Sequence, residues 1–278
     1  MSDLHSLNEV INERAGRKLL PSIGVGILIL ALVIGSLSVL DRILFLALAL
    51  AFVYRGIWEM ARALSRANIE ICGSLYISAT IIFLLAWLEG VAGIAVATAF
   101  TIPFTLIANL LRGPKDFVKN AFASIFTLAY IPLLASFLPV MAEESDGLRR
   151  IMTLVVLVAC NDTFGYIFGV LIGKHKMAPT ISPKKSWEGL CGSVIFTAIG
   201  GSLMLSTYFE QAWWVGALVG LGAVLTATSG DFIESAIKRD LDLKDMGALL
   251  PGHGGVLDRL DSVLLTSPFI WAILSLVS

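Results

Sequence analysis

Long apolar segments separated by short charged stretches dominate the chain from Leu19 to its C-terminal end. Most approach the roughly 20 residues that a helix needs to cross the hydrocarbon core of a bilayer. In lipid, only helices and closed barrels satisfy every backbone polar group. The pattern therefore predicts an all-α, polytopic integral membrane protein with about nine transmembrane helices. The expected spans are residues 19–40, 43–58, 71–88, 90–109, 117–141, 150–172, 190–208, 211–230 and 261–278.

Composition agrees with a membrane as the solvent. The 278 residues are 57% hydrophobic and 15% charged, with a mean hydropathy of +0.86, whereas soluble domains carry about 25% charged residues. A water-soluble fold cannot bury that much apolar surface. The formal net charge of −1 by itself indicates no class of partner, and we expect no nucleic acid among the partners.

The distribution of basic residues predicts the orientation. With a cytoplasmic N-terminus, all of the 20 lysines and arginines except Arg42, Arg149 and Arg150 fall on the inside, as the positive-inside rule requires. We expect a cytoplasmic leader at 1–18, which is either an amphipathic helix on the membrane surface or a frayed tail.

Transmembrane helices follow the leader over 19–149, and a C-terminal catalytic region covers 150–278. Its two cytoplasmic motif loops, 173–189 and 231–260, are the longest inside loops and offer the most chemically useful side chains.

The end of the eighth span carries the strongest sign of chemistry. Asp231, Glu234, Ser235 and Lys238 follow helical spacing, so a continuing helix stacks carboxylates and an ammonium on one face where it leaves the membrane. Taken alone, the stretch also fits a solvated helix end with an internal ion pair.

A glycine-rich loop from Pro251 to Gly255 follows, and aspartates stand behind it. Glycine lets backbone N–H groups approach phosphate oxygens, and Asp258 and Asp261, at i, i+3 spacing, can hold a divalent cation. Magnesium prefers one or two carboxylates plus substrate phosphates. We predict Asp231 and Asp258 as its first ligands and Asp261 as the third. His253 fits a phosphate contact and a structural role in the loop equally well.

The sixth span holds Asn161 and Asp162 near its middle. A lipid-facing carboxylate there costs several kcal/mol, so Asp162 must face protein or water. Tyr166, Gly169 and Gly173 share its helical stripe, which predicts a polar cavity that opens toward the cytoplasm. An Asn-Asp pair that holds two helices together remains the alternative.

The stretch from Ser182 to Gly189 is the last of the motifs that indicate chemistry. Lys184 and Lys185, beside a proline turn and the Trp187 anchor, indicate ligands for a polyphosphate or an anionic lipid head. Alone, the two lysines would also fit simple topology signals.

These motifs resemble the signature of the phosphatidate cytidylyltransferase family, whose members are also called CDP-diacylglycerol synthases. The resemblance runs without a departure from Ser235 to Asp261, and a second block covers Asn161 to Thr163, Gly173-Lys174 and Ser182 to Gly189. It therefore covers the C-terminal half well, whereas the first half resembles the family only in hydropathy.

The resemblance implies condensation of CTP with phosphatidic acid to CDP-diacylglycerol and pyrophosphate. It further implies a homodimer that contacts membrane lipids and lies in the inner membrane, with its active site facing the cytoplasm. As cofactors it implies Mg²⁺ and, as a second cation, K⁺. The catalytic residues expected are Asp231, Asp258, Lys238, Arg239 and Asp261. The substrate-binding residues expected are Asn161, Asp162, Ser182, Lys184, Lys185, Glu188, Ser235, Lys244, Asp245, His253, Gly254, Gly255 and Arg259.

The residues by themselves favour the same chemistry. A phosphate nucleophile is already anionic, so the difficulty lies in bringing two anions together, which cations solve without a general base. One rival is a related CTP-dependent enzyme for another lipid, either an ether-lipid cytidylyltransferase or a polyprenol-type kinase. The other is a transporter with Asp162 as a coupling-ion site.

Overall fold

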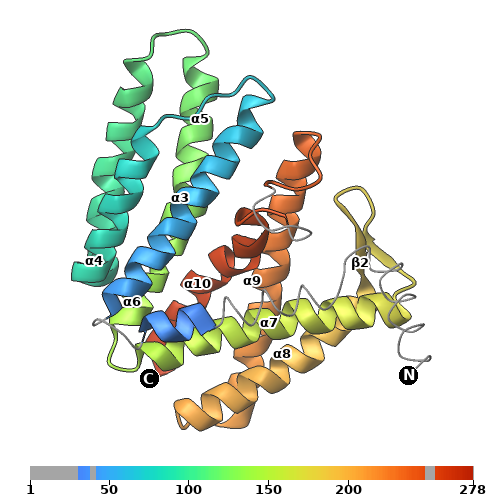
Figure 1. Cartoon of the computed structure of the whole chain (residues 1–278). Helices are drawn as coiled ribbons and strands as arrows, with labels where there is room; N and C mark the ends of the chain where they lie inside the picture. The colour runs from blue at the N-terminus through green and yellow to red at the C-terminus, as the bar shows by residue number, and fades with distance from the viewer. Residues whose placement is uncertain (1–30, 38–41, 248–253, 278) are drawn as a thin grey trace.

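Helices make up almost all of the chain in the computed structural model, which describes residues 31–37, 42–247 and 254–277 (Figure 1). The predicted leader, most of the first predicted span and His253 lie outside the described residues. The elements in chain order are α3 (Ile43–Ser65), α4 (Ser74–Leu110), α5 (Phe117–Leu128), the π-helix η2 (Ala129–Leu133), α6 (Phe137–Glu143), α7 (Gly147–Ile172), β1 (Lys176–Ala178), β2 (Ser182–Ser186), α8 (Trp187–Tyr208), α9 (Trp213–Asp240) and α10 (Leu257–Val277).

Seven helical segments of the described chain are long and apolar enough to cross a membrane. One of them, α4, contains two helices that meet at Gly90, whose φ of 61° lies in the left-handed region open to glycine. Ser78 Oγ and Thr105 Oγ1 are 3.3 Å apart, so the chain folds back on itself at this glycine. The break predicted between residues 88 and 90 is therefore observed, while two separate membrane spans at 71–88 and 90–109 stay a prediction. The protein is an all-α, polytopic membrane protein, and the count of nine and the side of the N-terminus stay predictions.

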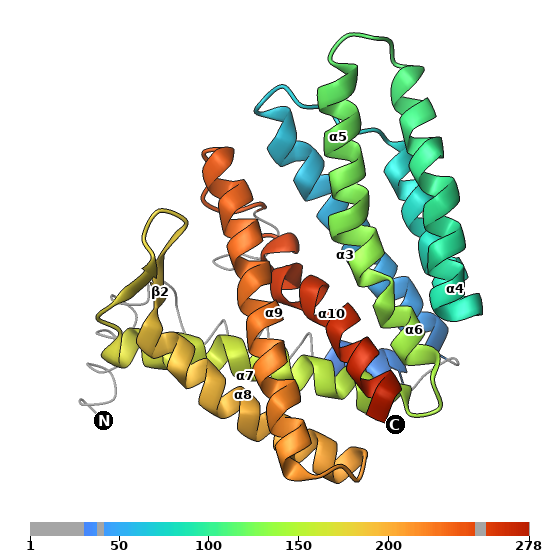
Figure 2. The ribbon, with the colours of Figure 1, turned by 180° about the vertical axis from the view of Figure 1, so that it is seen from behind.

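Two hydrophobic clusters divide the molecule, and α10 contributes to both. The first joins α3, α4 and η2 with Leu257 and Leu264 of α10. The second joins α6, α7, α8 and α9 with Ile270 and Leu274 of α10. In both views α10 lies between α9 and the group formed by α3, α4 and α5 (Figures 1 and 2). The C-terminal motif residues therefore lie where the two halves meet.

Small residues let α7, α8 and α9 pack closely. A methyl group on Gly169 would lie 3.5 Å from Ser186 Oγ and 3.9 Å from the Gly189 Cα. Gly173 is also packed against Ser186. These two glycines bring α7 close to the start of α8, as small residues do between membrane helices, and a cavity along this stripe stays a prediction.

The two predicted motif loops are more ordered than the sequence indicated. Within 173–189, β1 and β2 form an antiparallel hairpin, which projects beyond the ends of α7 and α8 (Figure 1). Within 231–260, α9 continues to Asp240 and α10 begins at Leu257. The helical face predicted for Asp231 to Lys238 is thus confirmed, and the loop proper is shorter than expected.

Candidate functional site

Three aspartates from three helices form the centre of the site. Ser262 Oγ donates to Asp231 Oδ1 at 2.7 Å and lies 3.4 Å from Asp162 Oδ1. The Asp261 carboxyl interacts electrostatically with those of Asp231 and Asp162. Lys185 of β2 forms an ion pair with Asp231. We call Asp162, Asp231 and Asp261 the acid cluster; it brings α7, α9 and α10 together.

Asn161 and Lys185 complete the surroundings of the acid cluster. Asn161 Nδ2 donates to Asp162 Oδ1 at 2.9 Å, and Asn161 is buried. Lys185 Nζ also lies 4.6 Å from the centre of the Phe232 ring, a cation–π contact that fixes the ammonium group. The intramembrane carboxylate of Asp162 therefore faces protein polar groups, as its cost in lipid requires.

A second group of charged side chains, Glu234, Lys238 and Asp258, begins one helical turn after Asp231 along α9. Lys238 Nζ pairs with Glu234 and also donates to Asp258 Oδ1 at 2.8 Å. The Glu234 side chain is 1% exposed, and its Oε1 has no hydrogen-bond partner. The pair is thus buried, which contradicts the simple reading of the α9 end as a solvated helix terminus.

Asp258 also organises the backbone of the glycine-rich loop. Its Oδ2 accepts from the Gly255 N–H at 2.7 Å and from the Met246 N–H at 3.0 Å. Gly254 has a φ of 78° and packs against the Asp258 carboxylate, a backbone conformation that glycine adopts without strain. The Asp258 carboxylate therefore joins Met246 and Gly255, on either side of the undescribed residues, to Lys238.

Two predicted site residues hold the hairpin in place instead of facing the acid cluster. Glu188 accepts from the backbone N–H groups of Lys174 and His175 and bonds His175 Nδ1 at 2.6 Å. Arg239 Nε donates to the Ile181 carbonyl at 3.2 Å. These contacts place Lys185 next to Asp231, because they join the hairpin to α8 and α9.

The remaining predicted residues are distributed around this centre. Lys244 and Asp245 are exposed on the turn after α9, and Lys184 is exposed on the hairpin. Ser182 pairs with Ala178 at the start of β2, and Ser235 and Arg259 are half-buried in their helices. Among the described residues, no side-chain hydrogen bond joins Lys244 or Asp245 to the acid cluster.

Sequence reasoning missed four polar residues of the site region. Glu234 was on the predicted face but received no role, and Ser262 follows Asp261 directly. Glu59 and Tyr130 come from the first half of the chain: Glu59 directly follows the predicted span 43–58, and Tyr130 lies within the span 117–141. Tyr130 is 5% exposed with an unpartnered hydroxyl in η2, and the charges of Asp261, Glu234 and Asp231 act on it. A charged residue at the very end of an apolar span was the available signal for Glu59.

The acid cluster has the donor set that magnesium prefers. Among the described residues, no group of three or more His, Cys, Asp or Glu side chains is arranged to hold a metal ion alone. Magnesium takes one or two carboxylates and completes its shell with phosphates and water. Three interacting carboxyls with one lysine partner favour a bound cation, since like charges repel at short range. A metal at Asp258 would compete with Lys238 for Oδ1.

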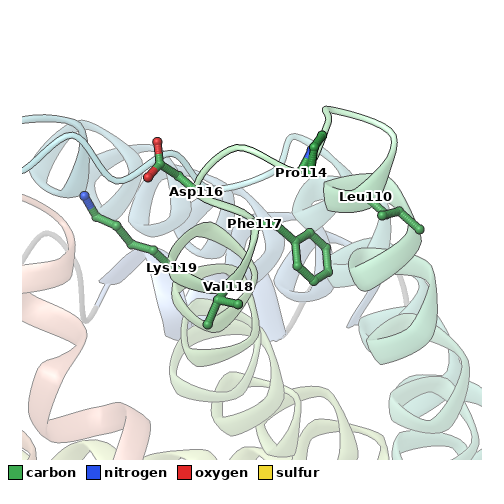
Figure 3. Close-up of a pocket in the computed structure, with 6 residues that line it drawn as sticks. All are labelled: Leu110, Pro114, Asp116, Phe117, Val118 and Lys119. Atoms are coloured by element: carbon green, nitrogen blue, oxygen red, sulfur yellow. The ribbon is translucent and has the colours of Figure 1, made fainter.

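A separate hollow of about 470 Å³ lies at the turn between α4 and α5 (Figure 3). All of its lining residues come from the end of α4, the turn and the start of α5. Lys119 at its edge donates to the carbonyls of Ala67 and Asn68, and Arg112 of the same turn pairs with Glu70. The contacts of these basic side chains connect neighbouring turns, and the hollow is distant in sequence from the acid cluster.

Fold and site together define a class: a polytopic α-helical membrane protein in which lysines and carboxylates from distant helices meet beside a glycine-rich loop. Comparison with known proteins gives the family. Residues 19–277 match the cytidylyltransferase family, and the chain belongs to it.

Relatives of known name align along most of the chain. A Mycobacterium leprae (strain TN) protein named phosphatidate cytidylyltransferase is 36% identical over 281 residues, which cover 95% of this chain and 90% of that protein. A protein of the same name from Mycobacterium bovis is 34% identical, with the same two coverages. One from Staphylococcus haemolyticus is 35% identical over 73% of this chain and 78% of that protein.

Proposed function

We propose that this protein transfers the cytidylyl group of CTP to phosphatidic acid and so forms CDP-diacylglycerol and pyrophosphate in phospholipid biosynthesis. The observation that carries the proposal is the match to named phosphatidate cytidylyltransferases over 95% of the chain. The grouping of Lys185 and Lys238 with carboxylates at the meeting point of α7, α9 and α10 supports it independently.

The reaction needs charge control more than proton transfer. A phosphate oxygen of phosphatidic acid attacks the α-phosphorus of CTP, the bond from that phosphorus to the bridging oxygen breaks, and pyrophosphate leaves. Since the nucleophile is an anion, no general base is required. Lys185 and Lys238 are the ammonium groups closest to the acid cluster and the loop, and they neutralise phosphate oxygens as charge develops.

The cations remain part of the proposal. Magnesium, held among Asp231, Asp258 and Asp261, would supply charge neutralisation and orientation of the phosphates, and K⁺ is proposed as a second cation. Asp162 lies beside this set, so its carboxylate belongs to the same electrostatic environment. Asn161 and Ser262 orient Asp162 and Asp231 by hydrogen bonds.

The cellular setting follows from the substrates. CTP is cytosolic and phosphatidic acid lies in the leaflet, so we propose that the site faces the cytoplasm from the inner membrane. This orientation agrees with the distribution of lysine and arginine along the chain. A homodimer is proposed from the resemblance to the family.

One assay tests the proposal directly. Purified protein in detergent receives CTP labelled in the cytosine ring and, in parallel reactions, phosphatidic acid, an ether-linked phosphatidic acid analogue or a polyprenol. The proposal is supported if, with phosphatidic acid as the acceptor, label moves into the lipid fraction and CTP releases pyrophosphate. Phosphorylation of the polyprenol without transfer of label indicates a kinase, and preference for the ether lipid indicates an ether-lipid cytidylyltransferase. If no reaction occurs with any of the three lipids, the enzyme assignment is overturned.

A further inference from the structure

Glu59 of α3 is a charged residue in the middle of the first hydrophobic cluster, and the proposed reaction gives it no role. Its side chain is completely buried. An isolated buried carboxylate is strongly unfavourable unless hydrogen bonds and a counter-charge compensate it. The partners of Glu59 are therefore informative about its purpose.

Those partners belong to the glycine-rich loop and the start of α10. Glu59 Oε1 accepts from the Val256 N–H at 3.1 Å, and Oε2 accepts from the Leu257 N–H at 2.9 Å. Arg55 Nε lies 3.2 Å from Oε1. Both carboxylate oxygens are thus used, and the N-terminal amides of α10, which have no partner within their helix, gain a negative charge.

The loop is shaped to receive this carboxylate. A methyl group on Gly247 or on Gly255 would overlap the carboxylate of Glu59. Asp258 binds the preceding amide, that of Gly255, from the other side. Three consecutive backbone N–H groups, at residues 255 to 257, therefore donate to two carboxylates that come from different halves of the chain.

We propose that Glu59 is a positioning residue: from the N-terminal half, it fixes the glycine-rich loop so that Asp258 and Lys238 are held in register with the acid cluster. This inference rests on the proposed function for its catalytic consequence, whereas the hold on the loop is a property of the protein alone. Glu59 itself touches no substrate in this scheme.

The test exploits the two oxygens of the carboxylate. In Glu59→Gln the side-chain size is kept, but one acceptor oxygen becomes an NH₂ group that faces a donor. Hydrogen exchange of the segment 254–258 is measured by mass spectrometry on the full-length protein in detergent. We expect exchange there to accelerate by about ten- to a hundredfold, the factor for one lost charge-assisted hydrogen bond. Exchange in α7 and α8 should stay as in the wild type.

Kinetics supply the second readout. Per folded molecule, kcat for cytidylyl transfer should fall by about tenfold or more while the KM for CTP changes by less than about threefold, because Asp258 and Lys238 act when charge develops. A purely structural role would reduce the amount of folded enzyme but leave kcat per folded molecule unchanged. Glu70→Gln is the matched control: Glu70 is exposed and pairs with Arg112, and its replacement should change neither readout.

If Glu59→Gln does not fold, Gly247→Ala tests the same contact from the loop side and should reproduce both effects with the carboxylate retained. Wild-type exchange at 254–258 in either folded variant overturns the inference, as does faster exchange with unchanged kcat. If the wild type lacks cytidylyl transfer altogether, the proposed function fails, and the exchange result still decides whether Glu59 holds the loop.

Discussion

Lys238 lies between two buried carboxylates, so its removal tests the electrostatics of the site sharply. Its ammonium group bonds Glu234 and Asp258, whose side chains are 1% and 6% exposed. Lys238→Met keeps a long side chain but removes the charge. Removing one partner of a buried ion pair costs about 3–5 kcal/mol, because the other charge is left uncompensated.

The structure places the effect near the lower end of that range. Asp258 keeps two backbone N–H donors after the replacement, each bond to a charged group being worth about 1.5–3 kcal/mol. Glu234 loses its ion pair with Lys238, and its Oε1 already has no hydrogen-bond partner among the described residues. A loss of about 3 kcal/mol lowers the thermal midpoint by roughly 6–12 °C, at about 2–4 °C per kcal/mol for a chain of this size.

The assay is thermal unfolding of the purified protein in detergent, combined with cytidylyl transfer. The double variant Lys238→Met with Glu234→Gln should regain most of the lost stability, because the uncompensated carboxylate is gone, but it should stay inactive. A single variant that melts within about 2 °C of the wild type would refute the argument for a compensated buried pair. A double variant that regains activity would refute the role of Lys238 toward phosphate oxygens.

Three further predictions follow from the site. Chelation of divalent cations should abolish transfer and added Mg²⁺ should restore it; full turnover after rigorous chelation would contradict the proposed cation. Asp231→Asn should reduce kcat at least about a hundredfold while the protein still inserts and folds, because it removes a charge from the acid cluster; measured activity above a tenth of wild type would speak against this role. Glu188→Ala should loosen the hairpin and lower the thermal midpoint without altering the cation requirement, and a changed Mg²⁺ dependence would instead indicate a direct role of Glu188 in the site.

The sequence alone determined the class of the protein and most of its chemistry. Apolar segments of bilayer length can only be helices in lipid, so the predicted spans at 71–88 and 90–109 appear as the two arms on either side of Gly90. Local spacing likewise placed Glu234 and Lys238 on one face of α9, where they pair.

The tertiary structure decided which of these groups meet and which only support the fold. Helical spacing carries no information on contacts between helices that are far apart in sequence. The Asp162 and Asp231 carboxyls, for example, meet through Ser262. Glu188 was predicted to bind substrate, yet its carboxylate holds the turn before β1.

Glu59 shows most clearly which contacts the sequence alone does not predict. Its backbone donors lie 197 and 198 residues away along the chain, and hydropathy marks Glu59 only as a charged residue at the end of an apolar segment. The energy of a buried carboxylate depends on the donors that surround it. Those donors are backbone amides, which every residue except proline carries, so only the folded chain reveals which of them Glu59 binds.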